Sequence, residues 1–204
     1  MPLFQGLGGV KSPVELFTTN YDTVLEDAIE LSSLEVSAGY KGSTSNRRLD
    51  LGLWSTGAAL PRNKRGLLTK LHGSVNWQRK HRDIHISAPF FSGQHEQHVI
   101  LYPGLKDTTA PEPFNAFHDR LAWALRQAQF VAFVGFAFRD PLINQILQRD
   151  LATQVRVFVS DRRPREQFQL GPLDGRDIEW SSDGFTATVS GRIAHLATRG
   201  LTAG

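Results

Sequence analysis

The chain has 204 residues, of which 40% are hydrophobic and 21% are charged, and its formal net charge is +3. This composition is typical of a folded globular protein and excludes a disordered chain, and the length can supply the core of one domain, which we predict over residues 1–204. The absence of cysteine excludes disulfide bonds, a thiol nucleophile and cysteine-bound zinc.

The first half of the chain contains two apolar runs that predict strands. Residues 14–19 combine β-branched and aromatic side chains, and residues 67–71 form the next run. Between them, Asp22 is suited to cap a helix. The apolar stripe of that helix would consist of Val24, Leu25, Ala28, Ile29 and Leu31. We also predict a loop-rich excursion over residues 36–66 and short strands at 81–86 and 99–102.

The second half shows a clearer alternation of helices and strands. Residues 113–128 have helical spacing after a proline, and residues 130–134 form a continuous apolar run typical of a strand buried on both faces. Asp140-Pro141 has the pattern of a helix start. Further strands are predicted at 155–159 and 178–180, and a last helix would carry Phe185, Val189, Ile193 and Leu196. This alternation predicts an α/β fold, a three-layer parallel sheet with flanking helices.

Polar clusters follow four of the predicted strands. In open parallel sheets, ligands bind beyond the carboxyl ends of the strands, where loops meet helix amino termini. The clusters are Thr19-Asn20-Tyr21-Asp22, His72-Gly73-Ser74, residues 135–140 and Ser160-Asp161-Arg162. If the strands are parallel neighbours, the clusters converge on one crevice, which indicates a nucleotide-cleaving site.

Three motifs, in this order, resemble those of the bacterial sirtuin-like domain family. They are Thr18-Thr19-Asn20-Tyr21-Asp22, Lys70-Leu71-His72-Gly73-Ser74 with Asn76-Trp77, and Val134-Gly135-Phe136-Ala137-Phe138-Arg139-Asp140-Pro141 with Ile143-Asn144. The resemblance spans roughly residues 14–180, which makes it more specific than any single motif. It implies a Rossmann-type fold that binds NAD and, as in many members of the family, hydrolyses it in defence against phage.

The resemblance also implies roles for individual residues. Asn20 and His72 match the residues on which hydrolysis depends, and Asp22 matches an acidic site position. Gly135 and Asp161 fall where the family contacts the adenosine half of NAD.

The chemistry of three residues fits cleavage of the bond between nicotinamide and ribose. His72 is the candidate base, because a neutral imidazole can accept a proton near pH 7. Asn20 can position the attacking water or the ribose. Asp22 can stabilise the positive charge that develops on the ribose, or hold the carboxamide.

A second set of residues is expected to bind the nucleotide. Gly73 and Gly135 would let the backbone approach the ligand closely. Ser160 or Asp161 can accept a hydrogen bond from the adenosine ribose. The other expected contacts are Thr19, Phe136, Arg139 and Asp140.

Most of these residues also have an ordinary structural interpretation. Asp22 and Asp140 suit helix N-caps, and Asn20 can tolerate an unusual backbone angle at a strand end. Arg139 can bind phosphate or simply pair with a neighbouring acid. A histidine followed by glycine is common in surface turns. The three motifs in order favour the functional interpretation for His72 and Asn20.

The family places a glycine-rich phosphate-binding turn upstream of the first motif, whereas only thirteen residues precede Val14. Gly6-Leu7-Gly8-Gly9 does not fit this turn, because no strand precedes it and Pro13 leaves no room for the following helix. We therefore expect an amino-terminally truncated chain. Two alternatives stay open: a catalytically weak module that senses NAD or ADP-ribose or serves in interaction, and an NAD-dependent protein deacylase. The lack of zinc-binding cysteines disfavours the deacylase.

Other partners are limited by sequence patterns. We expect no metal site, because His95-Glu96-Gln97-His98 lacks the spacing of a zincin helix. The sequence shows no membrane-spanning run and no signal-peptide pattern, so we expect a cytoplasmic protein without a membrane partner. Scattered basic residues with few interleaved aromatics disfavour nucleic acid. The expected partners are NAD or a related nucleotide, another copy of the chain, or a fused or paired effector.

Overall fold

The computed structural model describes residues 13–31, 35–43, 46–61, 63–87, 97–102, 111–184 and 186–199. The Gly6–Gly9 segment and Phe185, both considered above, lie outside these residues. The chain divides into two compact units. The amino-terminal unit comprises Pro13–Leu31 and Glu35–Arg120, and the carboxy-terminal unit contains the described residues from Leu121 onward.

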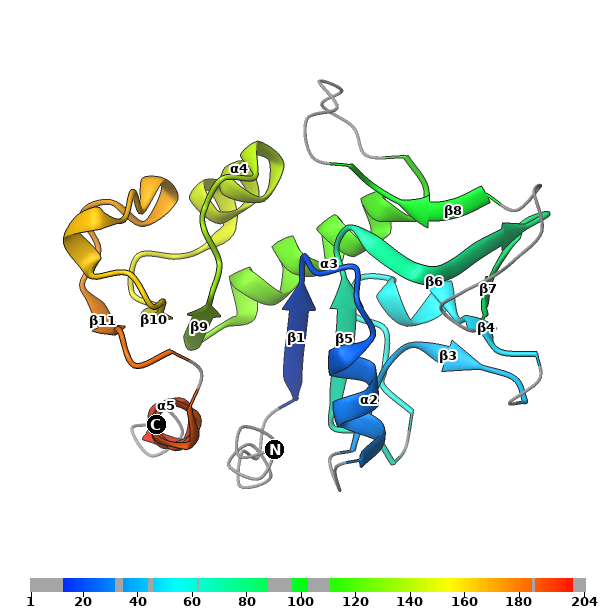
Figure 1. Ribbon diagram of the computed structural model, residues 1–204, viewed down its shortest axis with the longest axis horizontal. Helices are drawn as coiled ribbons and strands as arrows, with labels where there is room; N and C mark the ends of the chain where they lie inside the picture. The colour runs from blue at the N-terminus through cyan, green and yellow to red at the C-terminus, as the bar shows by residue number, and fades with distance from the viewer. Residues whose placement is uncertain are drawn as a thin grey trace. The chain divides into compact units, whose positions relative to one another are not determined.

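The amino-terminal unit contains a parallel three-stranded sheet in the order β1-β5-β2. The strands are β1 (Val14–Thr18), β5 (Gly66–Lys70) and β2 (Val36–Ser37). The predicted strands at 14–19 and 67–71 are therefore confirmed. Strands β1 and β5 pair over their full lengths, from Val14 opposite Gly66 to Thr18 opposite Lys70, and run side by side in Figure 1.

Helix α2 (Val24–Leu31) follows β1, as predicted, but its buried face differs from the predicted stripe. Val24 and Leu31 were expected to be buried, and this is wrong, because they are 56% and 90% exposed. The buried residues of α2 are Glu26, Ala28 and Ile29. An apolar stripe could not reveal Glu26, because this carboxylate is buried through an ion pair with Lys70 of β5.

The same unit contains a five-stranded antiparallel sheet, which was not expected from the sequence. Its order is β3 (Tyr40–Lys41), β4 (Arg48–Leu49), β7 (Asp83–Ile86), β6 (Gly73–Lys80) and β8 (Gln97–Ile100). The short strands predicted at 81–86 and 99–102 correspond to β7 and β8. The strands β2, β3 and β4 fall within the predicted loop-rich excursion, residues 36–66.

No element was predicted directly after the His72-Gly73-Ser74 cluster, and the structure shows that Gly73 begins strand β6. Ser74, Asn76 and Gln78 are buried although they are polar. Their burial hides the alternation of apolar and polar side chains by which a strand is recognised.

Aromatic side chains form the core of the amino-terminal unit. Phe117, on helix α3 (Phe114–Gln127), packs edge-on against Trp54 and Trp77, with ring centroids 4.9 and 5.8 Å away. Trp54 ends the 3-10 helix η1 (Leu51–Trp54), and its indole N–H donates to Thr69 Oγ1 of β5 at 2.8 Å. The excursion is thus anchored to the parallel sheet.

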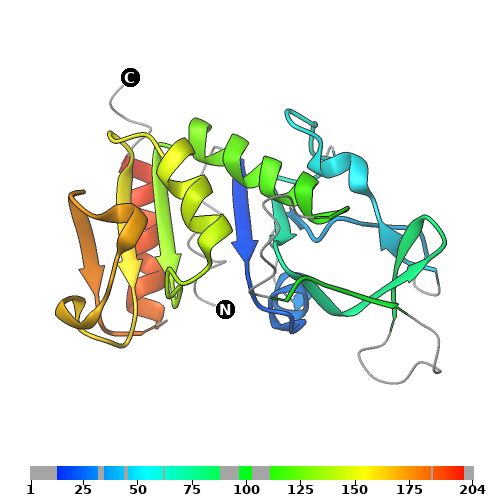
Figure 2. The same cartoon turned by 90° about the horizontal axis from the view of Figure 1, so that it is seen from above.

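The carboxy-terminal unit contains a second parallel sheet, in the order β11-β10-β9. Figures 1 and 2 show helices α4 and α5 on opposite faces of this sheet. Phe158 of β10 packs with Val189 and Ile193 of α5. The elements are β9 (Phe130–Val134), α4 (Pro141–Asp150), β10 (Arg156–Ser160), η2 (Arg165–Gln167), η3 (Gly171–Leu173), β11 (Ile178–Ser181) and α5 (Ala187–Arg199).

Strand β9 is less buried than its continuous apolar sequence predicted. Its five residues are partly exposed, Val134 to 39%. The reason is its place at the end of the sheet order, where only β10 pairs with it among the described strands of this unit. Both units nevertheless confirm the α/β class, with parallel strands and flanking helices. In the described ranges, no helix has the length and apolar character needed to cross a membrane.

Candidate functional site

The carboxyl ends of β1 and β5 bring the first two polar clusters together. The strands are parallel and end in register at Thr18 and Lys70, so the residues that follow leave the sheet at the same edge. We call residues Thr19–Asp22 the Asn20 loop. It lies beside the turn Leu71–His72. In parallel sheets, ligands usually bind at this edge, beyond the carboxyl ends of the strands.

Hydrogen bonds fasten the Asn20 loop to the segment around His72. The main-chain N–H of Leu71 donates to Thr18 O at 2.9 Å, and that of Val75 donates to Tyr21 O at 3.0 Å. The hydroxyl of Ser74 donates to the same Tyr21 carbonyl at 3.1 Å. The Tyr21 ring lies 6.2 Å from the imidazole of His72, centroid to centroid.

The three candidate catalytic residues differ in exposure and in their contacts. His72 is only 5% exposed, whereas Asn20 and Asp22 are exposed. The main-chain N–H of Asn20 donates to Thr18 Oγ1 at 3.1 Å. Asp22 Oδ1 accepts from the N–H of Val24 at 3.1 Å, so Asp22 caps α2. Asp22 therefore has the structural role of a helix cap, whereas its predicted catalytic role stays a prediction. Thr19, a predicted ligand contact, is half-buried.

The backbone of β8 explains why residue 73 is glycine. Gly73 has a φ of +83°, and a Cβ atom there would lie 2.0 Å from Val99 O. The main-chain N–H of Leu101 also donates to His72 O at 2.9 Å. Glycine at position 73 lets the backbone of the neighbouring strand β8 approach closely. This contact explains the glycine without a bound ligand.

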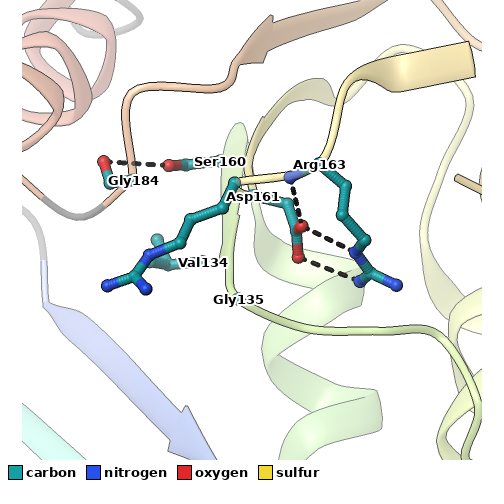
Figure 3. Close-up of a pocket in the computed structure, with 7 residues that line it drawn as sticks. Val134, Gly135, Ser160, Asp161, Arg163 and Gly184 are labelled. Carbon is teal, nitrogen blue, oxygen red and sulfur yellow. Dashed lines mark hydrogen bonds and ion pairs between the residues drawn. The ribbon is translucent and has the colours of Figure 1, made fainter. Parts of the chain in front are cut away.

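A second group of predicted residues meets in the carboxy-terminal unit. Val134 and Ser160, the last residues of β9 and β10, are in register. The N–H of Gly135 donates to Ser160 O at 2.8 Å, and that of Asp161 donates to Ser181 O at 3.1 Å. Beyond these strand ends lies a hollow of about 340 Å³ (Figure 3). It is lined by Val134, Gly135, Ser160, Asp161, Arg162, Arg163 and Gly184.

Gly135 leaves one wall of this hollow open. Its φ is +63°, and a Cβ atom placed there would meet no atom of the described residues within 4 Å. Unlike Gly73, this glycine is not required by a neighbouring strand. The space beside it fits the close approach of a ligand to the backbone.

The carboxylate of Asp161 is held by Arg163 (Figure 3). Asp161 Oδ1 accepts from the main-chain N–H and from Nε of Arg163, both at 2.9 Å, and Oδ2 accepts from the guanidinium at 3.1 Å. These bonds keep the pKa of the Asp161 carboxyl below its usual range. At neutral pH Asp161 is therefore an anion that can still accept a hydrogen bond from a ribose hydroxyl.

The other three predicted contacts do not line this hollow. Asp140 caps α4, because its Oδ1 accepts from the N–H groups of Leu142 and Ile143 at 2.9 and 3.0 Å. Phe136 packs on Phe138, with ring centroids 4.8 Å apart. Arg139 is exposed. Capping of α4 accounts for Asp140, and packing on Phe138 accounts for Phe136, without a ligand.

Sequence reasoning missed several residues of both groups. Arg163 and Gly184 line the hollow but were not singled out as contacts, and the ring of Tyr21 was not linked to His72. Lys70 was also missed, although one signal pointed to it. A lysine that closes an otherwise apolar run must find a partner when the run is buried.

The described residues contain no group of three histidine, aspartate or glutamate side chains that could hold a metal ion. Of the histidine-rich stretch considered above, His95 and Glu96 lie outside them.

Comparison with known protein families identifies a family for this chain. The sequence model of the SIR2-like domain family matches residues 14–177, from the first residue of β1 to the residue before β11. No curated protein matches the chain. The matched range contains each of the three motifs and both groups of residues described above, apart from Gly184.

Proposed function

This chain belongs to the SIR2-like domain family, and on that premise we propose that it is an NAD glycohydrolase, which cleaves the bond between nicotinamide and ribose. SIR2-like domains bind NAD, so the NAD-related function follows from membership. One observation supports the step to catalysis: the Asn20 loop and His72 lie together at the ends of two parallel strands, fastened by hydrogen bonds.

In the proposed reaction, nicotinamide leaves as a neutral molecule and needs no acid to protonate it. We assign His72 the role of base, which takes a proton from the attacking water as the new bond between oxygen and ribose forms. Asn20 orients this water or the ribose through its amide. The carboxylate of Asp22 stabilises the positive charge that develops on the ribose. The products are nicotinamide, ADP-ribose and a proton.

We assign recognition of the adenosine half to the hollow of the carboxy-terminal unit. Gly135 gives a ligand access to the backbone, and Ser160 or Asp161 accepts a hydrogen bond from the ribose. The open space beside Gly135 and the anionic state of Asp161 support this assignment.

The direct test is release of nicotinamide from NAD by the purified protein. We expect turnover by the wild type and a loss of 100-fold or more in His72→Ala, since a general base contributes about 10²–10⁴-fold. Asn20→Ala should show a smaller loss. If the wild type neither releases nicotinamide nor binds NAD in calorimetry, the proposal fails.

A binding module that senses NAD without cleaving it is the second candidate. It is favoured by the cap that Asp22 makes on α2, because this contact gives the carboxylate a structural role that does not involve a reacting ribose. Calorimetry separates the two candidates. Binding of NAD without release of nicotinamide would identify a sensor.

We further propose that the activity serves antiviral defence, on the resemblance to family members with that role. Phage should then form fewer plaques on cells that express the wild-type chain than on cells that express His72→Ala at the same level. Equal plaque numbers for both variants over a panel of phages would contradict this role.

A further inference from the structure

Lys70 is a buried cation that the proposed reaction does not use. It ends β5 two residues before His72, and it is only 2% exposed. An ammonium group at this depth is unfavourable unless charge and hydrogen bonds compensate for the lost water. Its partners therefore reveal what it holds in place.

The first partner of Lys70 is Glu26 of α2. Lys70 Nζ lies 2.9 Å from Glu26 Oε1, and both side chains are buried. The hydroxyl of Tyr40 donates to the same carboxylate oxygen at 3.2 Å. Burial, and next the nearby charge of Glu26, raise the pKa of the Tyr40 hydroxyl, so it stays neutral. The positive charge that balances Glu26 in this cluster thus comes from Lys70.

The second partner is the backbone of the Asn20 loop. Lys70 Nζ donates to the main-chain carbonyl of Asp22. The preceding carbonyl, that of Tyr21, accepts from Val75 and Ser74. The last two carbonyls of the loop are therefore both held by the chain that runs through His72, one by the start of β6 and one by the side chain of Lys70.

A purely structural role is the competing explanation. A buried ion pair is often no more stabilising than apolar side chains of similar size, so burial alone does not show what the pair is for. The same unit offers a comparison in Arg120 of α3, which is also 2% exposed and pairs with Glu15 of β1. The guanidinium of Arg120 donates to the carboxylate of Glu15 and to Ser55 O, and neither of these acceptors belongs to the Asn20 loop.

From these contacts we propose that Lys70 is a positioning residue. Its ammonium, held in place by Glu26, fixes the Asn20 loop relative to His72, so that the amide of Asn20 and the imidazole of His72 keep one geometry. The inference rests on the proposed function and adds to it a residue that acts through the loop without touching the substrate.

The first test compares Lys70→Met with Arg120→Met. Lys70→Met leaves the buried carboxylate of Glu26 without its cation, and Arg120→Met does the same to the partly buried carboxylate of Glu15, so both variants should melt at a lower temperature. Lys70→Met should also lower kcat for nicotinamide release by about 10- to 100-fold with little change in KM, because a displaced catalytic group slows the chemical step. Arg120→Met should keep the wild-type kcat below its melting temperature. Equal kcat losses in the two variants would overturn the inference.

A second variant separates position from stability. Lys70→Met combined with Glu26→Leu removes both charges, which should recover most of the lost melting temperature. It cannot restore the hydrogen bond to the carbonyl of Asp22. We expect kcat to stay at the level of Lys70→Met. Recovery of kcat together with stability would show that Lys70 serves only the fold.

Hydrogen exchange of the backbone tests the inference without turnover. Amides of residues 19–23 should exchange faster in Lys70→Met than in the wild type, and no faster in Arg120→Met. Exchange that is equal in all three proteins would refute the positioning role. If the wild type lacks NAD turnover but the loop loosens as expected, the proposed function fails and the contact of Lys70 with the loop stands.

Discussion

At the scale of single residues, several side chains of the candidate site also make structural contacts. Asp22 caps α2, Asp140 caps α4 and Asp161 is paired with Arg163. The sequence predicted the two caps, because an acid before a helical stripe is a recognisable start signal. It could not predict the pair of Asp161 with Arg163, since the residue types do not determine which of the neighbouring arginines donates to the carboxylate.

The pair of Asp161 with Arg163 gives stability a defined dependence on pH. Arg163 keeps the pKa of Asp161 below its reference value of 3.8, so the folded state favours the carboxylate. The pair therefore stabilises the fold above that reference value, and this contribution is lost as the pH falls through the lower pKa of the folded state. Asp161→Asn should be less stable than the wild type at pH 7, and the difference should shrink as the pH falls from 7 to below the reference value of 3.8. Thermal melts at both ends of this range measure it. A difference that is constant or grows on acidification would contradict the prediction.

Lys70 and Glu26 show where reasoning from sequence stops at this scale. Both lie in segments that the sequence placed correctly, in β5 and α2. Yet the apolar pattern predicts a charged residue of an amphipathic helix to face water. Only the packing of α2 beside β5 reveals that the two charges meet.

At the scale of elements, the parallel strands and their helices were predictable because each carries a strong local signal. Helix α4 begins at Pro141 after the cap Asp140, and β10 carries two valines and a phenylalanine among its five residues. Strand β6 carried no such signal. Ser74, Asn76 and Gln78 are buried polar residues, so the antiparallel sheet could not be recognised from the alternation of side chains.

The start of β6 gives a prediction for the amino-terminal unit. Gly73→Ala should be strongly destabilising, because alanine is strained at a φ of +83° and its Cβ would lie 2.0 Å from Val99 O. We expect a loss of about 2 kcal/mol or more in the free energy of unfolding in urea.

Gly57→Ala is the matched control. Gly57 has a similar φ of +75°, but within the described part of the chain its Cβ would meet no atom within 4 Å. It should show only the backbone strain, about 1 kcal/mol. Equal losses in the two variants would mean that β8 does not require the glycine.

At the scale of the whole molecule, the family was predictable and its activity is proposed. Three motifs in order indicated the sirtuin-like family, and the family match over residues 14–177 confirms it. The order of the motifs along the chain indicates the family, even though each motif alone would not identify it. Catalysis depends on the positions of a few atoms around His72, which residue order alone does not determine.

The central claim is that Asn20 and His72 act together in one step, the cleavage of NAD. The measurement that tests it most directly is nicotinamide release by the wild type, Asn20→Ala, His72→Ala and the double variant. Residues that serve one step lose activity non-additively, so the double variant should be no slower than His72→Ala alone. Losses that multiply, or a wild type that releases no nicotinamide, would contradict the account.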